Sequence, residues 1–207
     1  MRALVKRETP SQTAGPYVHI GLTPRLVGIE RPFQEDLGSS APVRAKGAVV
    51  PISLSGTVRD GAGALVSDAC LEFWQAGADG RYSSAPAFGT NTPDPQGFAR
   101  RAVGADTGLY RLETVKPGKV PMGDGRFQAP HIAVIVFARG INIGLLTRCY
   151  FDDEPDANAA DPVLAAIEPT GRRRTLIASA TTAPPSPRAY RFDIVLQGEN
   201  ETVFFRD

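Results

Sequence analysis

The chain has 207 residues, a length that suits one domain with a well-formed hydrophobic core. Its 23 lysines and arginines nearly balance its 22 aspartates and glutamates, so no net field would draw it to nucleic acid or to an anionic membrane. No apolar run follows the basic residues of the first ten positions, so neither a signal peptide nor a membrane anchor is predicted, and a cytoplasmic location is expected. The 21 glycines and 18 prolines are spread along the chain, which favours an all-β sandwich or barrel of short strands.

Residues 1–45 contain several prolines and little hydrophobic periodicity, which predicts an extended N-terminal arm that lies against something else. The folded body is expected over residues 46–207. It begins with a β-branched, apolar strand over 46–59, and the Asp-Gly-Ala-Gly sequence at 60–63 predicts a turn. The arm is therefore expected to contact a partner subunit, and the body to form a single-domain β-sandwich.

Further strands are expected over 69–76, 109–115, 131–138 and 142–151, and a long loop over 82–97. The 131–138 segment is apolar on both faces, as in a central strand. Residues 190–197 alternate between core and solvent positions, and 202–205 is expected to close the sheet. The only predicted helices are one or two short ones near 162–179, where Asp161 is a candidate N-cap followed by a first-turn proline.

Cys70 and Cys149 lie in apolar stretches and are expected to be reduced thiols in the core. A zinc site needs three or four convergent ligands, and neither these cysteines nor His19 and His131 have a close-spaced ligand neighbour. No nucleophile elbow and no phosphate-binding glycine loop is present. On local pattern alone, both histidines are best interpreted as structural or surface residues.

Five segments in order resemble the intradiol ring-cleaving catechol dioxygenases, and together they span nearly the whole chain: Gly56–Asp60, Glu72–Ala76, Asp79–Tyr82, Thr114–Gly118 and Ala129–Ile132. Two further segments, Thr9–Tyr17 and Phe137–Ile143, resemble the α chains of the heteromeric family members that act on 3,4-dihydroxybenzoate (protocatechuate). The resemblance implies a β-sandwich and an oxidoreductase subunit that works with non-haem iron.

Family enzymes hold Fe(III) with two tyrosines and a His-x-His pair, a set that suits a hard cation and a strand in which alternate residues share a face. The resemblance places Tyr82 and His131 at two of these four positions. Val120 and Ala133 stand at the other two, and neither side chain has a donor atom. The resemblance therefore implies that this chain holds no metal and no catalytic residue, and that Fe(III) is bound by a partner β subunit.

A further departure from the catalytic chains is Gln128, which stands where they carry an arginine. By the same resemblance Thr13, Gly15 and Pro16, with Tyr17 beside them, are expected to line the substrate pocket built on the β subunit. A stiff backbone with small side chains can approach an aromatic ring closely.

Arg139 is expected to present a fixed cation to the carboxylate that distinguishes protocatechuate from catechol. Without the family, the segment around Gly15 would be interpreted as a plain Pro-Gly turn, and Arg139 as a surface arginine.

The implied reaction is intradiol cleavage of 3,4-dihydroxybenzoate by O2 to 3-carboxy-cis,cis-muconate, a step of aromatic catabolism in the β-ketoadipate pathway. Two other hypotheses are open. The chain could be a free-standing β-sandwich binding module, which would not need the segment that ends at Tyr17. It could also be an independent iron enzyme with substitute donors among Tyr17, Tyr110, Tyr150 and Tyr190.

Overall fold

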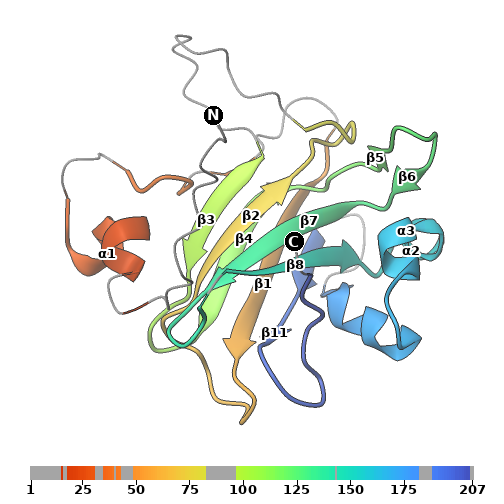
Figure 1. The fold of residues 1–207 in the computed structure, drawn as a ribbon. Helices are drawn as coiled ribbons and strands as arrows, with labels where there is room; N and C mark the ends of the chain where they lie inside the picture. Colours follow the sequence, from red (N-terminus) through yellow and green to blue (C-terminus); the bar gives the residue numbers. More distant parts are fainter. Residues whose placement is uncertain are drawn as a thin grey trace, which may run out of the picture.

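The computed structural model describes residues 15, 18–30, 35–39, 41–42, 49–82, 97–142, 144–181 and 188–205. Short strands dominate these residues (Figure 1), as the glycine and proline content predicts. The strands are β1 (Pro51–Arg59), β2 (Cys70–Gln75), β3 (Phe98–Ala102), β4 (Leu109–Val115), β5 (Val120–Pro121), β6 (Phe127–Gln128), β7 (His131–Phe137), β8 (Leu145–Phe151), β9 (Ile177–Ala180), β10 (Arg188–Arg191) and β11 (Ile194–Val195).

In the described part of the chain, one mixed sheet runs in the order β11-β1-β10-β9-β8-β7-β2-β3, and β4 pairs with β1. Neighbours are antiparallel except that β1 runs parallel to β10 and β11, and β8 runs parallel to β9. The apolar strand β7 lies between β2 and β8, which confirms its predicted central position. The short strands β5 and β6 form a separate hairpin just before β7.

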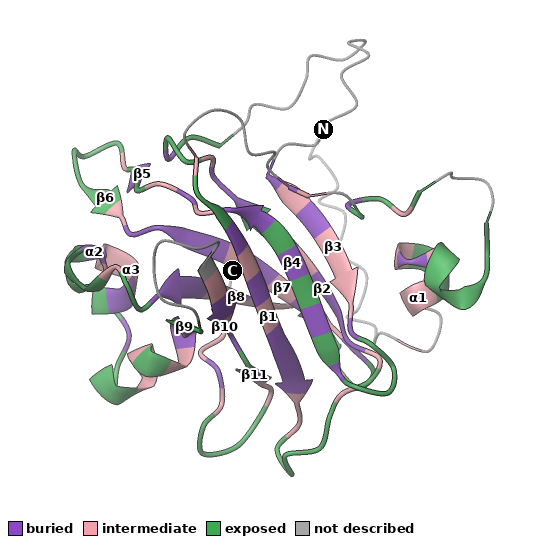
Figure 2. Cartoon of the chain, turned by 180° about the vertical axis from the view of Figure 1, so that it is seen from behind, coloured by how far each residue is buried: buried purple, intermediate pink, exposed green. Residues whose placement is uncertain are grey.

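The sheet folds over so that β1 and β4 pack against β2 and β7 across one hydrophobic core. Alternate residues of β4 are buried and exposed (Figure 2), as expected for a strand with one face on the core. The rings of Phe73 and Tyr110 meet across this core with centroids 5.7 Å apart. Both Cys70 and Cys149 are free and fully buried, which confirms the predicted core thiols. The predicted single-domain β-sandwich of mixed sheets is thus confirmed.

The helices are α1 (Val18–Leu22), η1 (Pro24–Val27), α2 (Pro155–Ala160), α3 (Pro162–Ala165) and η2 (Thr170–Leu176). The helical turns predicted near 162–179 are confirmed as α3 and η2, but the expectation that they are the only helices is wrong. Helix α2 carries no long apolar periodicity, and α1 and η1 lie between the prolines of the segment expected to be extended. Every helix in the described residues is too short or too polar to pass through a membrane.

The C-terminal alternation over 190–197 does not form one continuous strand. It is divided into β10 and β11 at Phe192 and Asp193, and the Asp193 carboxylate accepts hydrogen bonds from the backbone N and hydroxyl of Thr57. The expected closing strand at 202–205 is reduced to a single bridge between Phe205 and Leu146. Strand β3 and the β5–β6 hairpin were not predicted, because the former holds two arginines and the latter has strands of only two residues.

Candidate functional site

Tyr82 and His131 lie together where β7 begins. His131 is the first residue of this strand, and Tyr82 stands just beyond the turn that follows β2. The hydroxyl oxygen of Tyr82 is 3.4 Å from Nε2 of His131. The fold therefore brings together the two residues that the resemblance places at metal-ligand positions, although 49 positions separate them in the sequence.

The His131 imidazole is a buried, neutral group with both nitrogens engaged. Nδ1 of the ring is 2.8 Å from the carbonyl oxygen of Ala129. Because a carbonyl oxygen can only accept a hydrogen bond, Nδ1 carries the proton. Nε2 is then an acceptor for the Tyr82 hydroxyl. Burial lowers the pKa of His131 and raises the pKa of Tyr82, and both shifts favour the uncharged forms. The pair is joined by a long hydrogen bond between neutral groups.

The positions of the two missing ligands adjoin this pair. The β5–β6 hairpin pairs Val120 with Gln128, three residues before His131. Ala133 lies two residues after His131 and so on the same face of β7. An isopropyl group and a methyl group offer no donor, so the four positions supply one phenol oxygen and one imidazole nitrogen. Two donors do not fit the ligand set that the family uses for Fe(III).

Arg148 is a feature of this centre that sequence reasoning missed. It lies opposite Ala133 in the β7–β8 pairing and therefore on the same face of the sheet. Its Nη1 donates to Oε1 of Gln128 at 2.7 Å, and its guanidinium lies 5.8 Å from the ring centroid of Phe205. The signal in the sequence is one arginine inside the otherwise uncharged segment 142–151. We call the positions of Tyr82, Val120, His131 and Ala133 the vestigial centre. Beside it lies a guanidinium bonded to Gln128, the residue that the resemblance places where the family carries an arginine.

Three of the four tyrosines weighed as substitute ligands have partners in the core, and the fourth, Tyr17, lies outside the described residues. Tyr110 donates to the carbonyl oxygen of Phe192 at 2.5 Å, and Tyr190 donates to the carboxylate of Asp153 at 3.2 Å. Tyr150 stacks beside His131 with ring centroids 5.6 Å apart, and burial raises its pKa. Within the described ranges no group of three or more His, Cys, Asp or Glu side chains is placed to hold a metal ion.

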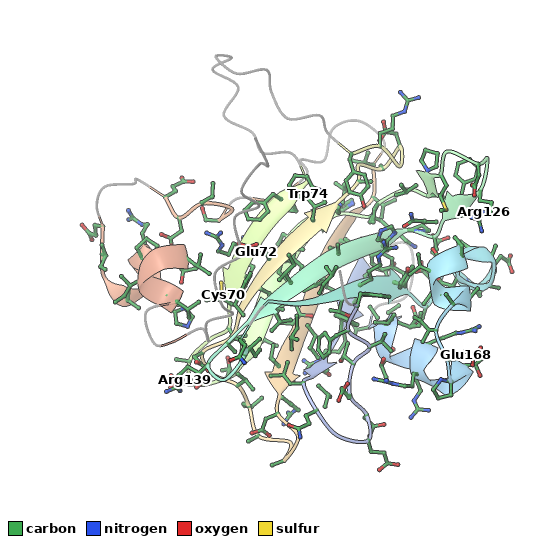
Figure 3. The ribbon with its side chains drawn as sticks, in the orientation of Figure 1. Cys70, Glu72, Trp74, Arg126, Arg139 and Glu168 are labelled. Atoms are coloured by element: carbon green, nitrogen blue, oxygen red, sulfur yellow. The ribbon has the colours of Figure 1, made fainter. Side chains whose placement is uncertain are left out.

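Arg139 lies at the opposite end of β7 from the vestigial centre. It follows the last residue of the strand by two positions, whereas His131 is the first residue. At about 3.3 Å per residue the two are separated by roughly 25 Å along the strand. In Figure 3 Arg139 lies near Cys70, away from Arg126, which marks the β5–β6 hairpin. The structure therefore does not bring Arg139 into the centre formed by Tyr82 and His131.

Gly15 is the one predicted pocket residue of the arm that the structure describes; Thr13, Pro16 and Tyr17 lie outside the described residues. Its carbonyl oxygen accepts from the backbone N of Val18 at 3.0 Å, just before α1. A Cβ added at Gly15 would meet nothing within 4 Å. Helix α1 lies at the β3 side of the sheet, remote from α2 and α3 (Figure 1), and Arg100 of β3 donates to the carbonyl oxygen of Leu22.

Comparisons with known proteins show the family to which this chain belongs. A family model described as Dioxygenase (Dioxygenase_C) matches residues 34–198. The chain is 50% identical over 202 residues to the protocatechuate 3,4-dioxygenase alpha chain of Pseudomonas putida, a match that covers 96% of both chains. It is 31% identical over 180 residues to the beta chain of the Burkholderia cepacia enzyme, covering 84% of this chain and 76% of that one.

Among solved structures, the dioxygenase domain of a dioxygenase–carbohydrate-binding fusion protein from Streptomyces sp. SirexAA-E has the same fold. It superposes with a TM-score of 0.58 at 27% identity and covers 93% of this chain and 100% of that domain. The motifs, the β-sandwich and these relatives lead to one conclusion. The chain belongs to the intradiol dioxygenase family that includes the protocatechuate 3,4-dioxygenase chains.

Proposed function

We propose that this chain is the α subunit of a heteromeric, cytoplasmic protocatechuate 3,4-dioxygenase, and that it completes the substrate pocket of a β subunit that holds the iron. The reaction of the complex is intradiol cleavage of 3,4-dihydroxybenzoate by O2 to 3-carboxy-cis,cis-muconate, in aromatic catabolism. The alpha-chain relative that matches over 96% of both chains supports this assignment. Residues 1–45 act as the arm that contacts the β subunit, and residues 46–207 form the body.

The observation that carries the proposal is the separation of two features at opposite ends of β7. At the start of β7, His131 and Tyr82 supply two metal-binding atoms where the family uses four, and the two side chains are hydrogen-bonded to each other. Beyond its last residue, Arg139 is exposed with a side chain 63% accessible. A cation presented at the surface, far from the chain's own vestigial centre, suits a pocket that a second polypeptide completes.

Fe(III) on the β subunit would supply the activation of the catecholate toward O2. This chain contributes shape through Thr13, Gly15, Pro16 and Tyr17, and charge through Arg139, which binds the carboxylate of the substrate. The guanidinium has a fork of terminal N–H donors that matches a carboxylate in two parallel hydrogen bonds. Catechol lacks this carboxylate, so the interaction selects protocatechuate.

The test is to purify the chain alone, and again after co-expression with a β chain, and to measure iron, visible absorption and ring cleavage. The tyrosinate-to-iron(III) charge transfer colours enzymes of this type. The chain alone is expected to be colourless and inactive, whereas the co-purified complex is coloured and cleaves protocatechuate in preference to catechol. Stoichiometric iron and activity in the chain alone would overturn the proposal. A chain that never associates with a β chain would favour the free-standing binding module instead.

A further inference from the structure

Asp68 holds Arg139 by two hydrogen bonds to one carboxylate oxygen. Oδ2 of Asp68 accepts from Nε of Arg139 at 2.7 Å and from the backbone N of the same residue at 3.1 Å. Both the direction of the side chain and the position of its backbone are therefore fixed from one point.

This contact follows from the register of the central strands. β2 and β7 are antiparallel, and Cys70 is paired with Phe137 at the end of their ladder. Asp68 lies in the turn two residues before this pair and Arg139 two residues after it, so the end of the ladder brings the two residues within hydrogen-bond distance. Gly140 follows Arg139 with a φ of 82°, a backbone conformation that lets the chain turn at once after the arginine. The carboxylate is thus anchored on the scaffold, and the cation is tethered to it.

The tether leaves the substrate-binding edge of the guanidinium open. The side chain of Asp68 is 19% exposed, whereas that of Arg139 is 63% exposed, so the carboxylate lies beneath and the cation points outward. Among the residues that the structure describes, the guanidinium of Arg139 is bonded through Nε alone, and its two terminal nitrogens form the fork that matches a carboxylate. The cation borders an open hollow of about 340 Å³ whose other polar side chains are Asn142 and Gln197.

We infer that Asp68 is a positioning residue for protocatechuate binding: it orients Arg139 so that the terminal fork meets the substrate carboxylate. The inference rests on the proposed function, since it presumes that Arg139 contacts the substrate. Arginine loses much rotamer freedom when it is fixed, and the Asp68 tether restricts that freedom before the substrate arrives. Asp68 also reduces the positive charge of the site, which weakens binding of the substrate carboxylate. Removal of Asp68 should therefore raise KM if positioning dominates and lower KM if charge dominates.

The test uses the complex with the β chain and compares Asp68→Ala, Asp68→Asn and Arg139→Ala. Asp68→Ala is expected to raise KM for protocatechuate about fivefold with kcat within about twofold, because it removes orientation and not a reacting group. Asp68→Asn keeps an oxygen acceptor for Nε and is therefore expected to raise KM for protocatechuate much less than Asp68→Ala does. KM for catechol should stay unchanged in both variants. Glu113→Ala, which breaks the exposed 2.6 Å Arg111–Glu113 pair on β4, is the control matched to Asp68→Ala and should alter neither substrate's KM.

A double variant distinguishes positioning from a general structural effect. Asp68→Ala should cost almost nothing in the Arg139→Ala background, because a tether has no role without the group that it holds. If Asp68→Ala lowers KM, or if its effect persists without Arg139, the inference is overturned while the function of Arg139 stands. If Arg139→Ala leaves the preference for protocatechuate over catechol intact, the proposed role of Arg139 is wrong and the inference is overturned with it.

Discussion

The hydroxyl of Tyr82 is 3.4 Å from Nε2 of His131, so two residues at metal-ligand positions of the family act here as hydrogen-bond partners for each other. The imidazole is held at its other nitrogen by the Ala129 carbonyl oxygen, 2.8 Å away. In a chain that binds the metal, the tyrosine oxygen and Nε2 of the histidine must both be free to bind it. The histidine then keeps one hydrogen bond, from the N–H of its other ring nitrogen. In this chain the arrangement is compatible with a structural role.

Tyr82→Phe should therefore leave the complex fully active and only slightly less stable. It removes one hydrogen bond from a half-exposed phenol, and the expected loss is about 0.5–1 kcal/mol in the free energy of unfolding. Urea unfolding and protocatechuate turnover of the same preparation measure both effects. A loss of activity of tenfold or more with normal stability would show that Tyr82 belongs to the catalytic machinery and would contradict the structural assignment.

Restoring the lost ligands tests what the vestigial centre lacks. Neither Val120→Tyr nor Ala133→His alone should bind ferric ion stoichiometrically, because an incomplete set leaves the ion open to hydrolysis and competing chelators. The double variant supplies four donors, but Arg148 lies directly opposite residue 133 and its charge opposes a cation. Adding Arg148→Gln should then raise iron affinity at least about tenfold, the effect of one partly screened charge.

Iron per chain and the visible tyrosinate absorption are the measurements for these variants, and circular dichroism checks that each one is folded. Stoichiometric iron in Ala133→His alone would show that fewer donors suffice. An affinity that does not change on removal of Arg148 would show that its charge does not reach the metal position.

Asp161 joins the start of β7 to the helical segment behind it. This fully buried carboxylate accepts from the backbone N of Val163 and Leu164 through Oδ1, and from the backbone N of Ala129 through Oδ2 at 2.7 Å. Asp161→Ala leaves three backbone donors without this partner and should cost about 3 kcal/mol of unfolding free energy. Asp161→Asn keeps one acceptor oxygen and should cost less. Equal losses in thermal unfolding of the two variants would contradict this account.

Gly56 of β1 lies directly against the backbone of Phe192, which joins the neighbouring strands β10 and β11. A Cβ at this position would be 1.8 Å from the carbonyl oxygen of Phe192, which also accepts the Tyr110 hydroxyl bond. Gly56→Ala should cost more than about 4 kcal/mol or prevent folding. Gly21→Ala in the exposed helix α1 meets nothing within 4 Å and should change stability by less than about 0.5 kcal/mol. Soluble yield and melting temperature compare the two, and a stable Gly56→Ala protein would show that the Phe192 backbone can move away from β1.

Much of the fold is predictable from the sequence because the strands alternate between core and solvent, and β7 is apolar on both faces. Strand β3 was missed since two arginines hide its pattern, yet Arg100 is bonded to Glu72 at 2.5 Å and its side chain is only 11% exposed. The absence of two ligands follows from residue types at matched positions. The pairing of Arg148 with Gln128 does not, because it depends on the register of β8 against β7. Contacts that arise from register, including that of Asp68 with Arg139, require the structure.

Asp193 should make the stability of the chain depend on pH in the acid range. Burial pushes the pKa of its carboxyl upward, but hydrogen bonds from Arg191 and Thr57 outweigh this and hold the pKa below its ordinary value of 3.8. A carboxyl whose pKa is lowered by folding stabilises the native state above its unfolded-state pKa, and the contribution is lost as pH falls through the lower native value. Asp193→Asn should thus destabilise at pH 7 by about 1 kcal/mol or less, since the pair is partly exposed and screened.

The difference in unfolding free energy between Asp193→Asn and the natural protein should shrink below about pH 3.8. Glu199→Gln, a change at an exposed residue, serves as the control in urea unfolding at both pH values. If the Asp193→Asn difference were as large at pH 3 as at pH 7, the loss would come from packing and not from the charge.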